Sequence, residues 1–265
     1  MESKNSSMRL ILASASSRRA DLLRAAGFDF ETVAADVDES VRPNESPAEY
    51  VQRLASDKSA AVQAALTAST KATAVRRSFT RRRKGCATGV EAPDAAESRT
   101  RKSTTPNCEM PSTMLNRPTG LAPVAQAFRP AFDSIVLGAD TAVVVDGIIL
   151  GKPRDDKESV AMLRQLSGRR HEVMTGISLR AGSRERRHVE TTAVYFATLS
   201  DDDVAWYVRS GEGRDKAGAY AIQGLASRFI PRIEGSYANV VGLPIAALCE
   251  LIRSIEAGSA APFNR

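Results

Sequence analysis

The pattern of hydrophobic and polar positions predicts strands and helices that alternate along most of the chain. Short apolar runs predict strands, whereas apolar residues spaced three and four apart predict amphipathic helices. The expected strands are Arg9–Ala13, Phe28–Ala34, an apolar run ending at Asp140, His171–Arg180, His188–Leu199 and Arg228–Ile233. The expected helices are Ser16–Ala26, Pro47–Leu66, Asp155–Leu166, Ser200–Val208 and Pro244–Ile255. The alternation predicts an α/β fold with a mixed sheet and flanking helices, which the two long strands would splay into two lobes.

Turn and capping residues support several of these boundaries. The pair Asp146-Gly147 predicts a tight hairpin after the strand that ends at Asp140. Asp155 and Ser200 stand where helix N-caps are expected, and Ser200 begins a Ser-x-x-Asp pattern. The glycine-rich segment 211–224 predicts a loop with one short strand.

Residues 67–130 interrupt the alternation. This segment holds six of the twelve prolines, is rich in Ser and Thr, and lacks a sustained period of either 2 or 3.6. Such a composition predicts a disordered insertion in a surface loop, which adds little loop-closure entropy to the cost of folding. The flanking segments, 9–66 and 131–257, are then one domain, and residues 1–8 and 258–265 are flexible termini.

The positive charge of the chain belongs to this insertion. The segment 67–130 contains twelve Lys and Arg against four Asp and Glu, a balance of +8, so the remainder carries −2 of the formal net charge of +6. A polyanion-binding role for the whole chain therefore does not follow. The run Arg81–Lys84 is consistent with nuclear import or RNA contact, but a solvated linker is the favoured interpretation.

Composition also points to a compartment. The chain has no apolar run of 18 residues, its first eight residues are polar, and its three cysteines lack the spacing of a metal site. These features predict a protein of the cytoplasm that makes no contact with a membrane.

The segment from Leu10 to Arg19 predicts a phosphate-binding turn. An apolar strand runs into small residues, including Ser14, and then into a helix whose first turn carries Arg18 and Arg19. The N–H groups of a helix N-terminus attract anions, and arginine adds bidentate contacts to phosphate. Arginine opposes the helix dipole at this end, so a purely structural role fits poorly.

Acidic residues and lysines predict a second part of the same site. Asp140 ends an apolar run, and the hairpin that follows returns the chain to Lys152 within Gly151-Lys152-Pro153. Three acids lie in the segment 36–39, which ends at Glu39 and is suited either to a metal ion or to a solvated loop. Lys58, on the long helix, would be an ordinary surface lysine if it stood alone.

A third candidate is the small-residue loop 215–224. Its small residues permit close approach of the backbone, and Gln223 offers both a donor and an acceptor to the edge of a nucleobase. An ordinary glycine-rich turn is the competing interpretation. The segment 235–244 then turns into the last helix.

Taken together, these motifs resemble the Maf family of nucleoside triphosphate pyrophosphatases. The chain contains, in order, the patterns SxSxRR, GADT, GKP, LSGRxHxVxT, DKAGAYxIQG and GSYxxVVGLP. The resemblance covers about three quarters of the chain and leaves out the insertion. It implies a fold similar to the inosine-triphosphate pyrophosphatases, with two lobes around a cleft. It also implies hydrolysis of a nucleoside triphosphate to the monophosphate and pyrophosphate.

The resemblance also implies a role for each site residue. Asp140 would be the proton acceptor and, with Glu39, would hold a divalent cation, Mg²⁺ or Mn²⁺. Lys58 and Lys152 would neutralise developing charge. The substrate-binding and specificity residues would be Ser14, Arg18, Arg19, Thr141, Asp215, Lys216 and Gln223. Family members are commonly homodimers, although no feature of this sequence marks an interface.

Subgroups of the family differ at positions that match Arg18, Thr141 and Gln223. The GADT motif and the glutamine resemble the subgroup acting on dTTP and UTP. We therefore expect dTTP, UTP and modified uridine triphosphates as substrates. The role would be to remove unusual nucleotides from the nucleotide pool. The alternatives are another nucleotide, such as 7-methyl-GTP or CTP, and a nucleotide-binding or nucleic-acid-binding regulator without turnover. Ser17 and Ala221 depart from the usual proline and glycine of the family.

Overall fold

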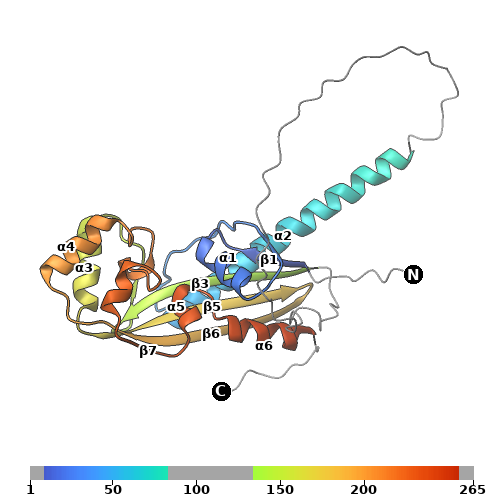
Figure 1. Ribbon diagram of the computed structural model, residues 1–265. Helices are drawn as coiled ribbons and strands as arrows, with labels where there is room; N and C mark the ends of the chain where they lie inside the picture. The colour runs from blue at the N-terminus through green and yellow to red at the C-terminus, as the bar shows by residue number, and fades with distance from the viewer. Residues whose placement is uncertain (1–8, 83–133, 257–265) are drawn as a thin grey trace, which may run out of the picture. The chain divides into compact units, whose positions relative to one another are not determined.

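A computed structural model describes the backbone of residues 9–82 and 134–256 and the side chains of 9–68 and 134–256. Contacts divide the chain into two units, residues 1–68 with 124–265 and residues 69–123. The first unit contains a seven-stranded mixed sheet (Figure 1). Its strands are β1 (Arg9–Ala13), β2 (Phe30–Thr32), β3 (Ser134–Val145), β4 (Ile148–Leu150), β5 (Arg170–Ala181), β6 (Arg184–Tyr195) and β7 (Arg232–Glu234). Their order is β2-β1-β3-β5-β6-β7, with β4 paired to β3.

Helices flank this sheet, as the sequence predicts. They are α1 (Ser17–Ala25), α2 (Pro47–Arg82), α3 (Asp156–Leu166), α4 (Asp201–Ser210), α5 (Tyr237–Val241) and α6 (Ile245–Glu256), with 3₁₀ turns at Ala217–Ala219 and Leu225–Phe229. The mixed α/β class is therefore confirmed, whereas the division into two lobes stays a prediction. Within the described residues, no helix is both long enough and apolar enough to cross a lipid bilayer.

The two faces of the sheet are buried by different helices. In β1, Leu10 and Leu12 pack in one core cluster with α1 and α6, whereas Ile11 and Ala13 pack in another with Val62 of α2. Successive residues of a strand point to opposite faces, so the uninterrupted apolar run of β1 results from burial on both sides. A further cluster lies under α3 and α4, around Tyr207 and Phe229.

Two glycines allow α2 to approach the sheet at backbone distance. A Cβ atom at Gly138 of β3 would lie 2.0 Å from the carbonyl oxygen of Ala55, and one at Gly176 of β5 would lie 2.3 Å from that of Val51. No side chain fits at either point. The contact brings Lys58, one turn beyond Ala55, directly over β3.

The turn and capping predictions are confirmed. Asp146 and Gly147 both have positive φ, 51° and 78°, as a tight two-residue hairpin between β3 and β4 requires. The side chain of Asp155 accepts a hydrogen bond from the amide of Glu158. Ser200 forms a capping box with Asp203.

The prediction that a strand ends at Asp140 is wrong. β3 continues to Val145, because β5 pairs with it from Val136 to Val144 and keeps the backbone extended. On the other edge of β3, β1 pairs as far as Gly138 and β4 begins at Val143. Asp140 thus lies in the interval between two edge partners rather than at a strand tip.

Several other boundaries differ from those expected. α2 continues to Arg82, beyond Leu66, so the start of the segment 67–130 is helical; the rest of that segment, like both terminal segments, lies outside the described residues. The loop 211–224 contains a 3₁₀ turn instead of a short strand. Of the strand expected at Arg228–Ile233, the first two residues belong to a 3₁₀ turn, and only Arg232 and Ile233 are in β7. Local hydrogen bonds close the turns in both regions, from the amide of Ala219 to the carbonyl oxygen of Lys216 and from that of Ile230 to that of Ser227. Helix α5 was not expected.

Candidate active site

The predicted site residues surround one cavity of about 730 Å³. It opens beyond the C-terminal end of β1, between the start of α1 and the segment 215–223. All eleven predicted residues line it: Ser14, Arg18, Arg19, Glu39, Lys58, Asp140, Thr141, Lys152, Asp215, Lys216 and Gln223. Residues up to 209 positions apart, from Ser14 to Gln223, therefore meet at one place, and the volume suits a small-molecule ligand.

The wall formed by α1 carries positive potential. The cavity is lined by the whole segment 14–19, which includes the first turn of α1, where backbone N–H groups lack helical partners. Ser14 Oγ accepts hydrogen bonds from the amide of Ser16, at 3.2 Å, and from Arg19 Nη1, at 3.0 Å. Its own proton is thereby left for a ligand. This wall is equipped for an anion.

Arg19 joins three segments of the site. Besides Ser14, its guanidinium donates to Thr141 Oγ1 at 3.0 Å and to the carbonyl oxygen of Gly242 at 2.8 Å. Among the described residues, these bonds use three of its five N–H donors. Burial lowers the pKa of Arg19, against the raising effect of Asp140. Arg19 thus holds these three segments together and still has N–H donors available for a bound ligand.

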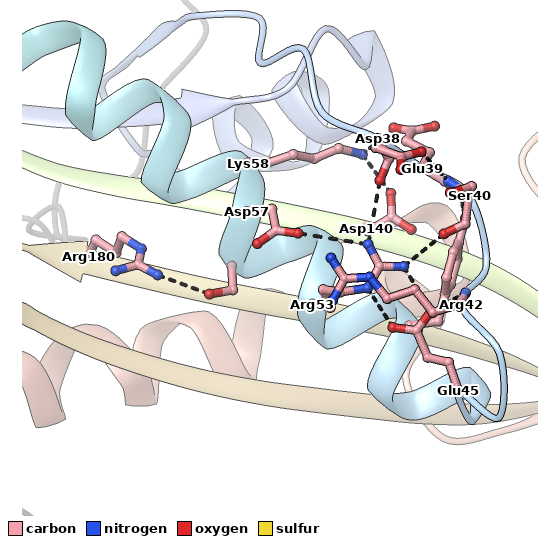
Figure 2. Close-up of polar contacts among 12 residues, drawn as sticks. Asp38, Glu39, Ser40, Arg42, Glu45, Arg53, Asp57, Lys58, Asp140 and Arg180 are labelled. Carbon is pink, nitrogen blue, oxygen red and sulfur yellow. Dashed lines mark hydrogen bonds and ion pairs between the residues drawn. The ribbon is translucent and has the colours of Figure 1, made fainter.

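Lys58 bridges two of the acidic residues of the site, Asp140 and Glu39. Its Nζ atom lies 2.7 Å from Asp140 Oδ1 and 2.6 Å from Glu39 Oε1 (Figure 2). The side chains of Lys58 and Asp140 are only 9% and 13% exposed, so the pair is shielded from solvent, while Glu39 is half exposed. Burial acts to raise the pKa of Glu39, but Lys58, Lys152 and Arg19 outweigh it and hold the pKa below its ordinary value.

Two residues of α2 that the sequence analysis missed hold the loop of Glu39 in place. Arg53 donates to the carbonyl oxygens of Asp38, at 3.4 Å, and Ser40, at 2.9 Å, and Tyr50 donates to that of Glu39 itself, at 3.0 Å. Figure 2 shows Arg53 reaching this loop from the same helix as Lys58. The sequence gives only a weak indication of this role, because Arg53 differs from a surface arginine only by lying on the same helix as Lys58.

Glu45 completes this arrangement. It pairs with Arg53 through both carboxylate oxygens, at 2.5 and 2.8 Å, and accepts the amide of Arg42 at 3.0 Å (Figure 2). The hydrogen bond from Arg53 is the main cause that lowers the pKa of Glu45 to about 2. A bidentate pair of this kind fixes both partners.

A chain of hydroxyl groups runs from Thr141 into the core. Thr141 Oγ1 lies 3.0 Å from Thr175 Oγ1, and Thr175 donates to the carbonyl oxygen of Asn239 at 3.1 Å. Asn239 in turn donates to Val173 and Thr192. Thr175 belongs to the motif LSGRxHxVxT, but nothing in the motif indicated this contact. The chain fixes the rotamer of Thr141 and, through it, Arg19.

The segment 215–223 forms the opposite wall. The amide of Gly218 donates to the carbonyl oxygen of Gly151 at 3.0 Å, which ties this segment to the turn that carries Lys152. Lys216 is paired with Asp215. Gln223 is exposed at the rim of the cavity.

Comparison with known proteins identifies the family. The family model described as Maf-like protein matches residues 9–255. The chain belongs to the Maf family.

Curated relatives within the Maf family match the chain over most of its length. A protein of Symbiobacterium thermophilum is 39% identical over 89% of this chain and 88% of its own. One from Photobacterium profundum is 38% identical over 91% and 93%, and one from Anaeromyxobacter dehalogenans is 35% identical over 97% and 98%. Each of the three is named dTTP/UTP pyrophosphatase.

Proposed function

We propose that the chain is a nucleoside triphosphate pyrophosphatase that hydrolyses dTTP and UTP to the monophosphate and pyrophosphate. The observation that carries the proposal is the meeting of Asp140, Lys58 and Glu39 with the α1 wall around one cavity. The names of the Maf relatives support this choice of nucleotides. Such an enzyme would remove unwanted nucleotides, modified uridine triphosphates among them, from the pool.

The geometry supports a direct hydrolytic mechanism. Ser14, Arg18 and Arg19 bind the phosphates, and Lys58 and Lys152 offset the charge that develops on the bridging oxygen as it leaves. A water molecule attacks phosphorus, the α–β anhydride bond breaks, and Asp140 accepts the proton of the water. Lys58 holds Asp140 Oδ1 at 2.7 Å and so fixes the orientation of the carboxylate. Phosphoryl transfer asks a protein mainly for positioning and charge, which these residues supply.

We propose that a divalent cation, Mg²⁺ or Mn²⁺, joins this site. The residues fit one, because Glu39 and Asp140 already present carboxylate oxygens to a single cationic atom, Lys58 Nζ. No cluster of three or more candidate ligands occurs among the described residues. That agrees with Mg²⁺, which is commonly bound through one or two carboxylates together with substrate phosphates. When bound, the ion would neutralise phosphate charge and acidify a nearby water molecule.

The nucleobase is assigned to the rim formed by Gln223. Its amide pairs with a uracil or thymine edge through one donor and one acceptor, and Asp215 and Lys216 line the same wall. A panel of nucleotides with Mg²⁺ tests the assignment. The proposal expects kcat/KM to be highest for UTP and dTTP, and a preference for 7-methyl-GTP or CTP would contradict it.

Two wider expectations belong to the same proposal. We place the activity in the cytoplasm, and we expect a homodimer, which sedimentation of the purified chain would test. A regulator without turnover is disfavoured because Asp140, Lys58 and Lys152 all face the cavity. We expect no contact with nucleic acid outside the segment 67–130.

A further inference from the structure

The rim that carries Gln223 is attached to the protein at both of its ends by one pair of side chains. Tyr207, on α4, is buried, with 1% of its surface exposed, and it donates to Glu212 Oε2 at 2.8 Å. Neither residue lines the cavity, and neither belongs to the motifs noted in the sequence. Their position behind the rim raises the question of what the pair holds.

The pair binds three backbone amides of the rim. Tyr207 Oη accepts the amide of Ala221 at 3.2 Å. Glu212 accepts the amide of Leu225 on Oε1 at 2.9 Å and that of Ala226 on Oε2 at 3.4 Å. The two residues that lie between these attachments and line the cavity are Ile222 and Gln223.

Gly224 shows how closely the carboxylate fits behind the rim. A Cβ atom at Gly224 would lie 1.9 Å from Glu212 Oε1. The φ of Gly224 is −113°, so the backbone itself does not demand glycine. The missing side chain makes room for the carboxylate, which cannot move aside without losing its hydrogen bonds.

We propose that Tyr207 and Glu212 are specificity-positioning residues, which set the nucleobase preference by holding both ends of the segment 221–226. This inference rests on the proposed function, because it assigns the base to the rim. The pair touches no reacting group, so it acts on base binding and leaves the hydrolytic step to Asp140 and Lys58. A carboxylate that accepts several donors cannot be replaced by an amide, whose NH₂ group would face an N–H donor.

Three variants disturb the pair in different ways. Tyr207→Phe keeps the ring in its apolar cluster but removes the hydroxyl group. Glu212→Gln replaces an acceptor by a donor, and Gly224→Ala displaces the carboxylate while leaving both partners intact. A matched control exists in Tyr195 and Glu234, a second Tyr–Glu pair, at 2.9 Å, outside the cavity lining. Tyr195→Phe and Glu234→Gln remove the same chemistry from a different place.

The decisive measurement is discrimination between bases. For each variant we would compare equilibrium binding of UTP and CTP analogues with a non-hydrolysable α–β link, and kcat and KM for UTP and CTP. We expect the preference for UTP to fall about tenfold, through binding and KM, with kcat for UTP changed less than about threefold. Hydrogen exchange at amides 221, 225 and 226 should quicken. The control variants should keep the wild-type preference.

The outcomes separate this inference from the proposed function. Unchanged preference in all three variants, despite faster exchange at the rim, would overturn the inference, and so would an equal loss in the control pair. If the variants had a lower melting temperature but kept the wild-type preference for UTP over CTP, the pair would have only a structural role. If the wild-type chain binds the UTP analogue selectively and the variants do not, yet no pyrophosphate is released, the inference stands and the proposed function fails.

Discussion

Asp140 shows how a single side chain depends on its neighbours. Its carboxylate is buried and lies 2.7 Å from Lys58, which also contacts Glu39. The sequence predicted that these three residues would meet but placed Asp140 at a strand end. The interval between the edge partners β1 and β4 could not be predicted, because β1 and β3 are more than a hundred residues apart in the chain and their pairing leaves no local signal.

The role of Asp140 as proton acceptor can be tested by Asp140→Asn. Asparagine keeps the size of the side chain and an oxygen for Lys58, but it cannot take up a proton. We expect kcat for UTP to fall by about 10²–10⁴-fold while nucleotide affinity changes only a few-fold. Steady-state kinetics and calorimetric binding measure the two quantities. Activity close to that of the wild type would remove Asp140 from this role.

Glu45, which holds Arg53 against the loop of Glu39, should make the stability of the fold depend on pH. Arg53 lowers its pKa from 4.5 to about 2, so Glu45 stabilises the folded state fully above pH 4.5, and this contribution is lost as the pH falls through that range. We expect the melting temperature of the wild type to fall between pH 5 and pH 2. In Glu45→Gln this fall should be smaller, because glutamine has no carboxylate to protonate. An identical pH dependence in the variant would show that the pair with Arg53 contributes nothing.

At the scale of elements, the contact between α2 and the sheet places Lys58. The apolar stripe of α2 predicted the helix and its buried face, and Val51, Leu54 and Val62 are buried. The closeness of the contact was not predicted, because a glycine within an apolar run gives no indication of what will lie opposite it. Gly138 and Gly176 have this role only once β3 and β5 pair beneath α2.

Gly138→Ala should therefore harm activity through α2. The added methyl group would lie 2.0 Å from the carbonyl oxygen of Ala55, so the helix must shift and carry Lys58 with it. We expect a loss of about 1–3 kcal/mol in the free energy of unfolding and a fall in kcat/KM of the order of 100-fold.

Gly27→Ala provides the control for simple destabilisation. Gly27 has a φ of +79°, and a Cβ atom there would meet none of the described residues within 4 Å. Alanine at this position therefore costs about 1 kcal/mol of backbone strain without touching α2. Thermal melting and UTP kinetics, measured on Gly138→Ala and Gly27→Ala, compare the loss of stability with the loss of activity in each variant. If Gly138→Ala lost stability but kept full activity, the glycine contact would not position Lys58.

At the scale of the whole molecule, the chemistry is confined to one unit. The described residues that line the cavity fall within 13–58 and 140–242, and all of them belong to the unit that contains the sheet. The sequence predicted an insertion at 67–130 from its six prolines, its charge balance of +8 and its lack of a sustained helical or strand period. It did not predict the helical continuation to Arg82.

Replacing residues 69–123 by a Gly/Ser linker of about twelve residues should leave catalysis intact, because such a linker spans the gap as a flexible coil. We expect kcat/KM for UTP within about twofold of the wild type, measured on the purified shortened chain. A matched assay with single-stranded RNA would show whether the basic run contributes affinity for nucleic acid. A loss of UTP turnover above tenfold would mean that this segment takes part in the site.

The central claim is that the cavity cleaves the α–β anhydride of a uridine or thymidine triphosphate. Phosphorus NMR of UTP incubated with the full-length chain and Mg²⁺ tests it directly. Cleavage of the α–β bond gives UMP and pyrophosphate, whereas cleavage of the β–γ bond gives UDP and orthophosphate. We expect UMP and pyrophosphate in equal amounts, and formation of both about 10²–10⁴-fold slower with Asp140→Asn. The appearance of UDP and orthophosphate would contradict it, and so would UTP that stays intact while another nucleotide is consumed.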